Sequence, residues 1–282
     1  MMSRSCSRCS PATCAETRET HYMKVAPIVS PVTQWRSPPE PLVLGHNEVH
    51  VWRASLDQPA SQLENFRLSL AADERARAQR LYFRKGRERF TVARGVLRAI
   101  LGGYLNREPE SLSFCYGSHG KPGLGGYLDR DAIRFSVSHS HGFALYAFAR
   151  GREVGIDLER IRFDLAVTEV AERFFSPKEV AALRALPPDL QRQAFFRCWT
   201  RKEAYIKARG EGLSLPLDEF DVSLAPEEPA AVLAIRHDHS EASRWSLQEL
   251  TVAPDYVAAL SVEAHDWRLS CWLWLNPGQQ LF

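Results

Sequence analysis

The stretch VGIDLER, residues 154–160, places two carboxylates in a segment that otherwise has the composition of a buried β-strand. In an extended strand alternate side chains share a face, so Asp157 and Glu159 point to one side and the apolar residues to the other. Two acids on one face repel each other unless water or a cation lies between them. The segment therefore predicts either the solvated face of an edge strand or part of a cation site.

Two further strands are predicted directly before this stretch. Apolar residues alternate in IRFSVS, and the apolar run FALYAFA follows after a turn at HSHG. If the three segments form an antiparallel meander, the first ends at His139 and the third brings Asp157 and Glu159 to the same end. The pattern thus predicts a histidine and two acids at one rim of a sheet.

The segments before these strands predict a first strand at EVHVWRASL and then two helices, over residues 71–80 and 85–105. Between Glu74 and Arg98 the chain has nine Lys or Arg and only two Glu. Such a basic run is typical of a solvated helix face, but it is also what a phosphate-binding wall requires. Both interpretations stay open at this point.

After residue 161 the pattern becomes helical. Ser176 is placed to cap a helix, with Glu179 in capping-box register. A proline pair ends that helix, and Asp189 is expected to cap a longer one that stops at a glycine. In this longer helix Glu203 and Lys207 lie one turn apart and share a face. The rest of the chain predicts short strands that complete a sheet.

The composition is that of an ordinary globular protein, with 282 residues, 45% of them hydrophobic and 25% charged. The net charge of +2 gives no general indication of an anionic partner. No apolar run approaches the roughly 18 residues that a membrane-spanning helix needs, and the N-terminus lacks the apolar core of a secretory signal. We therefore expect a cytoplasmic protein.

The chain is expected to have three parts. Residues 1–44 are rich in Ser, Pro and Arg and predict a mobile extension. Residues 45–153 and 154–282 are expected to form an N-terminal and a C-terminal lobe. The extension holds the spacing C-x-x-C at Cys6 and Cys9, but no second pair follows, which favours free thiols over a zinc site.

Five motifs occur in order between about Val49 and Asp221: GKP, FSVSHSHG, VGIDLER, RFFSPKE and WTRKEAYIKARGEGLSLPLDEFDV. Together they resemble the signature motifs of the Sfp-type 4′-phosphopantetheinyl transferases. The resemblance implies an α+β fold of two pseudo-twofold-related lobes. Each lobe would be a small antiparallel sheet packed with helices, with coenzyme A bound in the cleft between them. It also implies a monomer.

The activity that this resemblance implies is a Mg²⁺-dependent transfer. The 4′-phosphopantetheine arm of coenzyme A would move to a serine of an apo acyl- or peptidyl-carrier protein, releasing adenosine 3′,5′-bisphosphate. The partners would be coenzyme A and the carrier, which is an acidic helical bundle in this family. The resemblance implies no binding of nucleic acid or of a membrane. The matching positions for metal ligands are Asp157, Glu159 and Glu203, three hard oxygen donors of the kind that Mg²⁺ prefers.

The same resemblance assigns the coenzyme contacts. Lys121 and Pro122 match a loop beside the adenine end, and Ser138 and His139 match residues that touch the phosphates. Two basic residues fall where the family places phosphate-binding side chains: Arg77 and Arg89.

The resemblance also suggests catalytic roles on the long helix. Lys207 would neutralise the leaving group, and Glu203, or a metal-bound water that it orients, would accept the serine proton. One position departs from the pattern: Glu74 occupies a basic position of the family, and Arg75 is the available substitute.

Two activities of other classes use the same residues. A metal-dependent phosphohydrolase could employ the histidine and the carboxylates but would need no carrier protein. A nucleic-acid-binding module could use the basic run, although Phe83 and Phe90 do not form a stacking pattern and the net charge is near zero. The mass of a carrier after incubation with coenzyme A and Mg²⁺ distinguishes the three.

Overall fold

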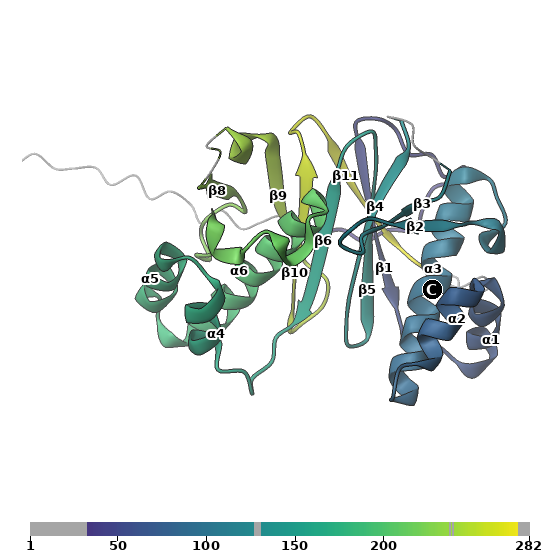
Figure 1. The fold of residues 1–282 in the computed structure, drawn as a ribbon, viewed down its shortest axis with the longest axis horizontal. Coiled ribbons are helices and arrows are strands. Elements are labelled where there is room, and N and C mark those ends of the chain that lie inside the picture. Colours follow the sequence, from purple (N-terminus) through teal and green to yellow (C-terminus); the bar gives the residue numbers. More distant parts are fainter. Residues whose placement is uncertain (1–32, 127–130, 237, 239, 276–282) are drawn as a thin grey trace, which may run out of the picture.

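Two β-sheets lie side by side at the centre of the molecule, with helices on both outer sides (Figure 1). The computed structural model describes residues 33–126, 131–236, 238 and 240–275. The helices are α1 (Ala60–Ser69), α2 (Ala72–Gln79), α3 (Arg84–Leu105), α4 (Val167–Phe174), α5 (Pro177–Ala185) and α6 (Pro188–Arg209). The strands are β1 (Glu48–Ser55), β2 (Phe114–Tyr116), β3 (Pro122–Leu124), β4 (Ile133–Ser140), β5 (Phe143–Arg150), β6 (Val154–Arg160), β7 (Phe220–Val222), β8 (Val232–Ile235), β9 (Trp245–Leu250), β10 (Tyr256–Glu263) and β11 (Arg268–Leu273). The predicted α+β class is confirmed.

The first sheet has the order β11-β1-β5-β4 and the second β6-β10-β9. Because side chains alternate along a strand, each central strand contributes to two cores. In β1, Trp52 packs with the apolar face of α3, whereas Val51 packs with residues of the second sheet, among them Ile156 and Leu260. The four layers are thus helices, sheet, sheet and helices.

Helix α6 approaches the second sheet closely because of one residue. A Cβ atom at Gly155 of β6 would lie 2.0 Å from the carbonyl oxygen of Ala204 and 2.3 Å from the amide nitrogen of Ala208. Only glycine can occupy that position without moving the helix. This contact sets α6 against β6, and it brings the helix face that carries Glu203 and Lys207 next to Asp157.

The third strand of the predicted meander is paired differently. The hairpin of β4 and β5 is present, but β6 pairs antiparallel with β10 in the second sheet and not with β5. Strand β6 instead runs parallel to β4 and is held by side chains. The hydroxyl groups of Ser136, Ser138 and Ser140 accept hydrogen bonds from the backbone amides of residues 156, 158 and 160, at 3.1, 3.2 and 3.1 Å. We call this arrangement the serine ladder.

Long-range pairings were not foreseen either. Strand β11, near the end of the chain, returns to the first sheet and pairs parallel with β1. Residues 33–44, expected within the mobile extension, contact both sheets: the Trp35 indole donates to the carbonyl of Thr251 at 2.7 Å, and Leu44 is buried. Cys6 and Cys9 lie outside the described residues. The lobe boundaries and the pseudo-twofold relation stay predictions.

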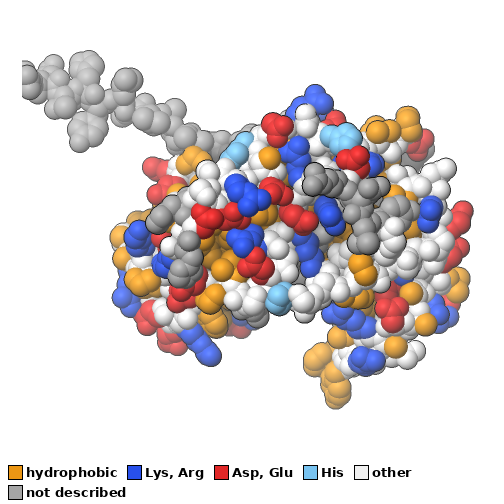
Figure 2. All heavy atoms as spheres, turned by 45° about the horizontal axis from the view of Figure 1, so that its top comes forward, with side chains coloured by type: hydrophobic (Ala, Val, Ile, Leu, Met, Phe, Trp, Pro, Cys, Tyr) orange, Lys and Arg blue, Asp and Glu red, His pale blue; other side chains and the backbone are white. Residues whose placement is uncertain are grey.

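The predicted helix start is confirmed at α5 and wrong at α6, whereas the predicted end of α6 at a glycine, Gly210, is confirmed. Ser176 accepts from the Glu179 amide at 3.2 Å while the Glu179 carboxylate accepts from the Ser176 amide at 3.0 Å, which is the expected capping box. Helix α6 begins at Pro188, so Asp189 lies inside its first turn and is not its cap. Within the described part of the chain, no helix is both long and apolar enough to cross a membrane. Acidic and basic side chains are intermingled on the face shown in Figure 2.

Candidate active site

Asp157 lies in the middle of β6, where this strand of the second sheet runs beside β4 of the first. Its carboxylate is buried, with 3% of the residue exposed. Oxygen Oδ1 accepts from the Ser138 hydroxyl at 2.9 Å and from Lys207 Nζ at 2.6 Å, and Lys207 also donates to Ser138 at 3.1 Å. The other oxygen, Oδ2, is buried without a hydrogen-bond partner among the described residues. A buried, unpaired carboxylate oxygen is costly, so this atom needs a ligand.

Glu159 lies two residues further along β6 on the same face. Its oxygen Oε2 accepts from the Ser140 hydroxyl at 3.1 Å. Partial burial raises the pKa of Glu159 above the ordinary value, and the negative charge of Asp157 raises it further. The serine ladder therefore has a second role: Ser138 and Ser140 each accept from a β6 amide and donate to a β6 carboxylate.

Helix α6 supplies the third acid. Glu203 is half-buried, and burial together with the charge of Asp157 raises its pKa, while Lys207 opposes the shift. The charge of Asp157 thus acts on both Glu159 and Glu203. Three acids share one electrostatic environment, although they come from two separate elements.

The residues offer the chemistry of a Mg²⁺ site but are not arranged as one in this conformation. Within the described ranges, no three His, Cys, Asp or Glu side chains form a group that could hold a metal ion. The unpaired Oδ2 of Asp157 and the raised pKa values of its two acidic neighbours nevertheless fit a divalent cation, since all three donors are hard oxygens. Lys207 supplies the positive charge that Asp157 contacts here.

His139 follows Ser138 at the end of β4 and is exposed. The surrounding protein still removes enough water from the imidazole to lower its pKa below the ordinary value. The positive charges of Lys207 and Arg77 lower that pKa further, and Asp157 opposes them. His139 therefore belongs electrostatically to the same cluster, as does Arg77.

The two predicted phosphate-binding arginines differ in their surroundings. Arg77 is exposed, and its guanidinium lies 5.6 Å from the centre of the Phe90 ring. Arg89 donates two hydrogen bonds to Asp57, both at 2.9 Å, and this pair lowers the pKa of Asp57. Arg89 is thus already neutralised, whereas the charge of Arg77 is open to a ligand.

Glu74, the departure from the family pattern, has a structural role. It is buried and accepts from Arg94 Nε at 2.6 Å and from Arg98 Nε at 2.6 Å. It also accepts from the amide of Ala71 at the start of α2 at 2.9 Å. Arg75, the available substitute, donates to the carbonyl of Leu70. Glu74 therefore closes an internal ion cluster and does not face a ligand.

A cavity of about 290 Å³ lies beside the acids. It is lined in part by Lys121 and Pro122 of the predicted coenzyme loop and by Glu203 and Lys207. The ammonium group of Lys121 donates to Glu153 at 2.8 Å and to the carbonyl of Ala208 at 3.0 Å, and burial lowers its pKa. Lys121 therefore holds the loop against the second half of the molecule.

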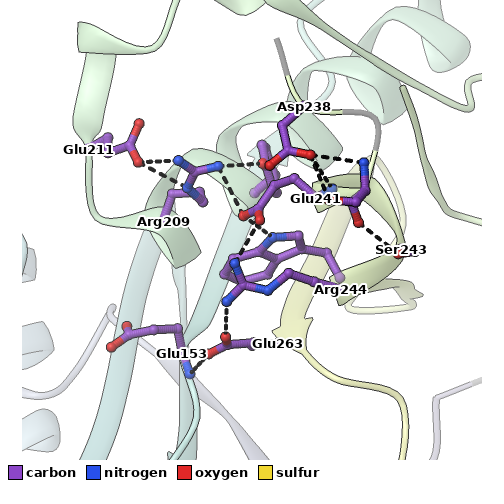
Figure 3. A network of polar contacts seen from close by, with 11 residues as sticks. Glu153, Arg209, Glu211, Asp238, Glu241, Ser243, Arg244 and Glu263 are labelled. Carbon is purple, nitrogen blue, oxygen red and sulfur yellow. Dashed lines mark hydrogen bonds and ion pairs between the residues drawn. The ribbon is translucent and has the colours of Figure 1, made fainter. Parts of the chain in front are cut away.

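A polar network lies at the C-terminal end of α6, on the side of the second sheet (Figure 3). Arg244 donates to Glu241 at 2.7 Å and to Glu263 at 2.6 Å, and Arg209 at the end of α6 donates to Glu241 at 3.1 Å. Arg209 also pairs with Glu211. These pairs join the end of α6 to the turn before β9 and to the end of β10.

A second cavity, of about 440 Å³, has Glu159 in its lining. Its walls are largely apolar and aromatic: Leu165, Val170, Phe195, Phe196 and Trp199. His141 and Arg162 stand with Glu159 as its polar residues. Glu203 thus lines the first cavity and Glu159 the second.

Sequence reasoning missed several residues near the site. Ser136 and Ser140 were not singled out, although their alternation with Ser138 in FSVSHS indicated one shared face. Lys202 is fully buried and contacts Glu179 at 2.8 Å, so it is a structural residue. Phe175 of the RFFSPKE motif is buried in the core.

Comparisons with known proteins identify the family of the chain. A family model described as the 4′-phosphopantetheinyl transferase superfamily matches residues 153–261, which include all three acids. The chain is 44% identical over 238 residues to the 4′-phosphopantetheinyl transferase HetI of Nostoc sp., covering 84% of this chain and 97% of that protein. It is 32% identical over 171 residues to the 4′-phosphopantetheinyl transferase Sfp of Bacillus subtilis, covering 60% and 74%. The chain therefore belongs to the 4′-phosphopantetheinyl transferase superfamily.

Proposed function

We propose that this transferase moves the 4′-phosphopantetheine arm of coenzyme A to a serine hydroxyl of an apo acyl- or peptidyl-carrier protein. Family membership supports the reaction class. The observation that carries the proposal for this chain is Asp157, a buried carboxylate with one oxygen paired to Lys207 and the other unpaired, between two further acids. We also propose a cytoplasmic monomer.

Asp157, Glu159 and Glu203 would hold Mg²⁺, which would act as a Lewis acid on the diphosphate and offset its negative charge. The raised pKa values of Glu159 and Glu203 support this assignment, because a bound divalent cation would relieve the repulsion that causes them. The serine ladder would keep Asp157 and Glu159 oriented before any ligand arrives.

The chain's own cations would hold the phosphates. Lys207 would neutralise charge on the leaving nucleotide as the phosphorus–oxygen bond to it breaks. His139 and Arg77 would bind further phosphate oxygens. Phosphoryl-type transfer depends more on such positioning and charge neutralisation than on covalent help from the protein.

Glu203 is our candidate to accept the proton of the carrier serine. A carboxylate whose pKa is raised by burial is a stronger base than an exposed one. The serine oxygen would attack the β-phosphorus, its proton would pass to Glu203, and adenosine 3′,5′-bisphosphate would leave.

The two cavities suggest how coenzyme A would lie. Its charged nucleotide end suits the cavity with Lys121 and Pro122, next to Lys207. The uncharged pantetheine arm suits the aromatic cavity beyond Glu159, since apolar walls with a few polar groups are typical of such ligands. The diphosphate would then bridge the two, beside Asp157.

Incubation with coenzyme A, Mg²⁺ and an apo-carrier, followed by mass spectrometry of the carrier, tests the proposal. The expected result is a mass gain of one phosphopantetheine arm, which disappears with EDTA and returns with Mg²⁺. A carrier whose serine is replaced by alanine is the matched control. Release of free phosphopantetheine with an unchanged carrier would instead indicate the phosphohydrolase.

A further inference from the structure

The corner between α2 and α3 exposes a cluster of large apolar side chains. Leu81, Tyr82 and Phe83 are 37%, 88% and 74% exposed. The two aromatic rings pack edge to face with their centres 5.0 Å apart. Clustered exposed apolar side chains, unlike single ones, indicate an interaction site. We call residues 80–85 the α2–α3 corner.

The backbone of this corner is held rigidly. Arg87 donates two hydrogen bonds, both at 2.9 Å, to the carbonyl oxygens of Leu81 and Tyr82. The Leu81 amide donates to the carbonyl of Ala78 at 3.1 Å. A rigid aromatic pair loses little conformational entropy when a partner covers it, which is the property of a binding anchor.

Positive charge surrounds the aromatic pair. Arg80, Arg84 and Lys85 are all exposed. Arg84 pairs with Glu88 at 2.6 Å, and Lys85 lies 3.9 Å from Asp57. The side chain of Arg80 makes no hydrogen bond or ion pair with any residue that the structure describes. The corner therefore offers an apolar anchor with uncompensated positive charge, which favours a partner with acidic residues.

The corner also stands close to the candidate active site. On α3, Arg89 binds Asp57, and the neighbouring amide of Leu56 donates to the carbonyl of Gly142 at 2.8 Å. Gly142 is in the turn between β4 and β5, directly after the end of β4 that carries His139. On α2, Arg77 lies one turn before the corner and acts on His139 electrostatically. These contacts link the corner to the rim that carries His139, where the candidate active site opens.

We propose that the α2–α3 corner is the docking surface for the carrier-protein substrate, with Tyr82 and Phe83 as the apolar anchor and Arg80 as the cation for an acidic side chain of the carrier. This inference rests on the proposed function, which requires a macromolecule to bring a hydroxyl to this rim. In Figure 2 apolar side chains project at the lower edge of the molecule, on the side of α1 to α3, with Lys or Arg side chains beside them.

An acidic protein fits the corner better than a nucleic acid or a membrane. Both of those surfaces are uniformly anionic and are bound by extended basic faces. Here Asp73 and Glu88 interrupt the basic run on either side of the corner, and the net charge of the chain is only +2. A local anchor with one open arginine suits a protein helix that presents both apolar and acidic side chains.

The test measures steady-state transfer by the full chain to a purified apo acyl-carrier protein. In Tyr82→Ala/Phe83→Ala the KM for the carrier should rise about tenfold, as expected when a binding anchor is removed, while the KM for coenzyme A should stay unchanged. Arg80→Glu should also raise the carrier KM and weaken its dependence on salt. Leu68→Ala, which removes a side chain of a residue 65% exposed on α1, is the matched control and should change neither constant.

Three outcomes would overturn the inference. One is an unchanged carrier KM in the double variant at an unchanged melting temperature. Another is an equal rise in the KM for coenzyme A. The third is binding of phosphatidylserine vesicles or a single-stranded oligonucleotide that the double variant loses while its carrier KM is unaltered. Failure of the unsubstituted chain to modify the carrier would refute the proposed function itself, so the two failures are distinguishable.

Discussion

Glu74 and Asp157 are both almost completely buried carboxylates, 2% and 3% exposed, yet their surroundings differ. Both oxygens of Glu74 accept hydrogen bonds, from Arg94 and from Arg98 and the Ala71 amide. Only one oxygen of Asp157 is paired; the other is buried without a hydrogen-bond partner in the described part of the chain. The same chemical group is thus saturated in one place and unsaturated in the other.

This difference distinguishes a carboxylate with a structural role from one that is a candidate for binding a ligand. A saturated buried carboxylate needs nothing more and fixes helices α2 and α3 against each other. An unsaturated one, with two further acids whose pKa values are raised, has an oxygen available to a ligand. Burial and charge alone would not have distinguished the two sites.

The largest effect is expected from Asp157→Ala. Transfer should fall by about 100-fold or more, the loss typical when a preorganised electrostatic group is removed from an active site. The melting temperature should change little, because the substitution removes a buried unpaired oxygen, which offsets the loss of the hydrogen bonds that Oδ1 accepts from Ser138 and Lys207. Mass spectrometry of the carrier and a thermal melt measure both. A large loss of stability with activity retained per folded molecule would show that Asp157 is a structural residue like Glu74.

Glu74→Gln should show the opposite behaviour. Arg94 and Arg98 would keep their charges without the carboxylate, and breaking a buried ion cluster costs about 3–5 kcal/mol of the free energy of unfolding. Urea denaturation measures this loss. Transfer per folded molecule should stay within a factor of about two. Strongly reduced activity at full stability would place Glu74 in the phosphate site after all.

A smaller effect extends the comparison to two arginines. Arg77→Ala should raise the KM for coenzyme A about tenfold, since its open charge is available to a phosphate. Arg89→Ala should raise it less, because Asp57 already neutralises Arg89. Neither variant should change the KM for the carrier in the same proportion. A larger effect from Arg89 would mean that the Asp57 pair opens when coenzyme A binds.

The smallest effect concerns pH. The pKa values of Glu159 and Glu203 in the folded protein are raised above the ordinary 4.5. Their contribution to the stability of the fold is therefore fully present below pH 4.5 and is lost as the pH rises through the raised pKa values. In EDTA the free energy of unfolding of the unsubstituted protein should therefore decrease over this pH range more than that of the Glu159→Gln/Glu203→Gln variant. Mg²⁺ should remove the difference at neutral pH. Identical pH profiles of the two proteins would argue against the shared charge environment.

The local parts of this site could be predicted from sequence. Strand alternation placed Asp157 and Glu159 on one face, and helical spacing placed Glu203 and Lys207 on another. These relations depend on neighbouring residues only, so periodicity is sufficient to find them.

The pairing of distant strands could not be predicted in this way. Periodicity indicates that β6 is a strand but not that it pairs with β10, and nothing local links β11 to β1, about 220 residues earlier along the chain. The pairing of both Glu74 oxygens likewise depends on Arg94 and Arg98, which belong to another helix, α3, and lie more than two turns from its first residue. A motif shows which acid is present, and only the fold shows whether its oxygens are paired.

The serine ladder has a consequence for aggregation. Strands β4 and β6 are edges of their sheets, and exposed edge amides can recruit a strand from another molecule. Here the amides of residues 156, 158 and 160 are occupied by hydroxyl groups, which are too short to continue a backbone ladder. The two sheets can therefore meet at β4 and β6 without fusing into one continuous sheet, and these amides on the inner edge of β6 are not open to intermolecular β-pairing.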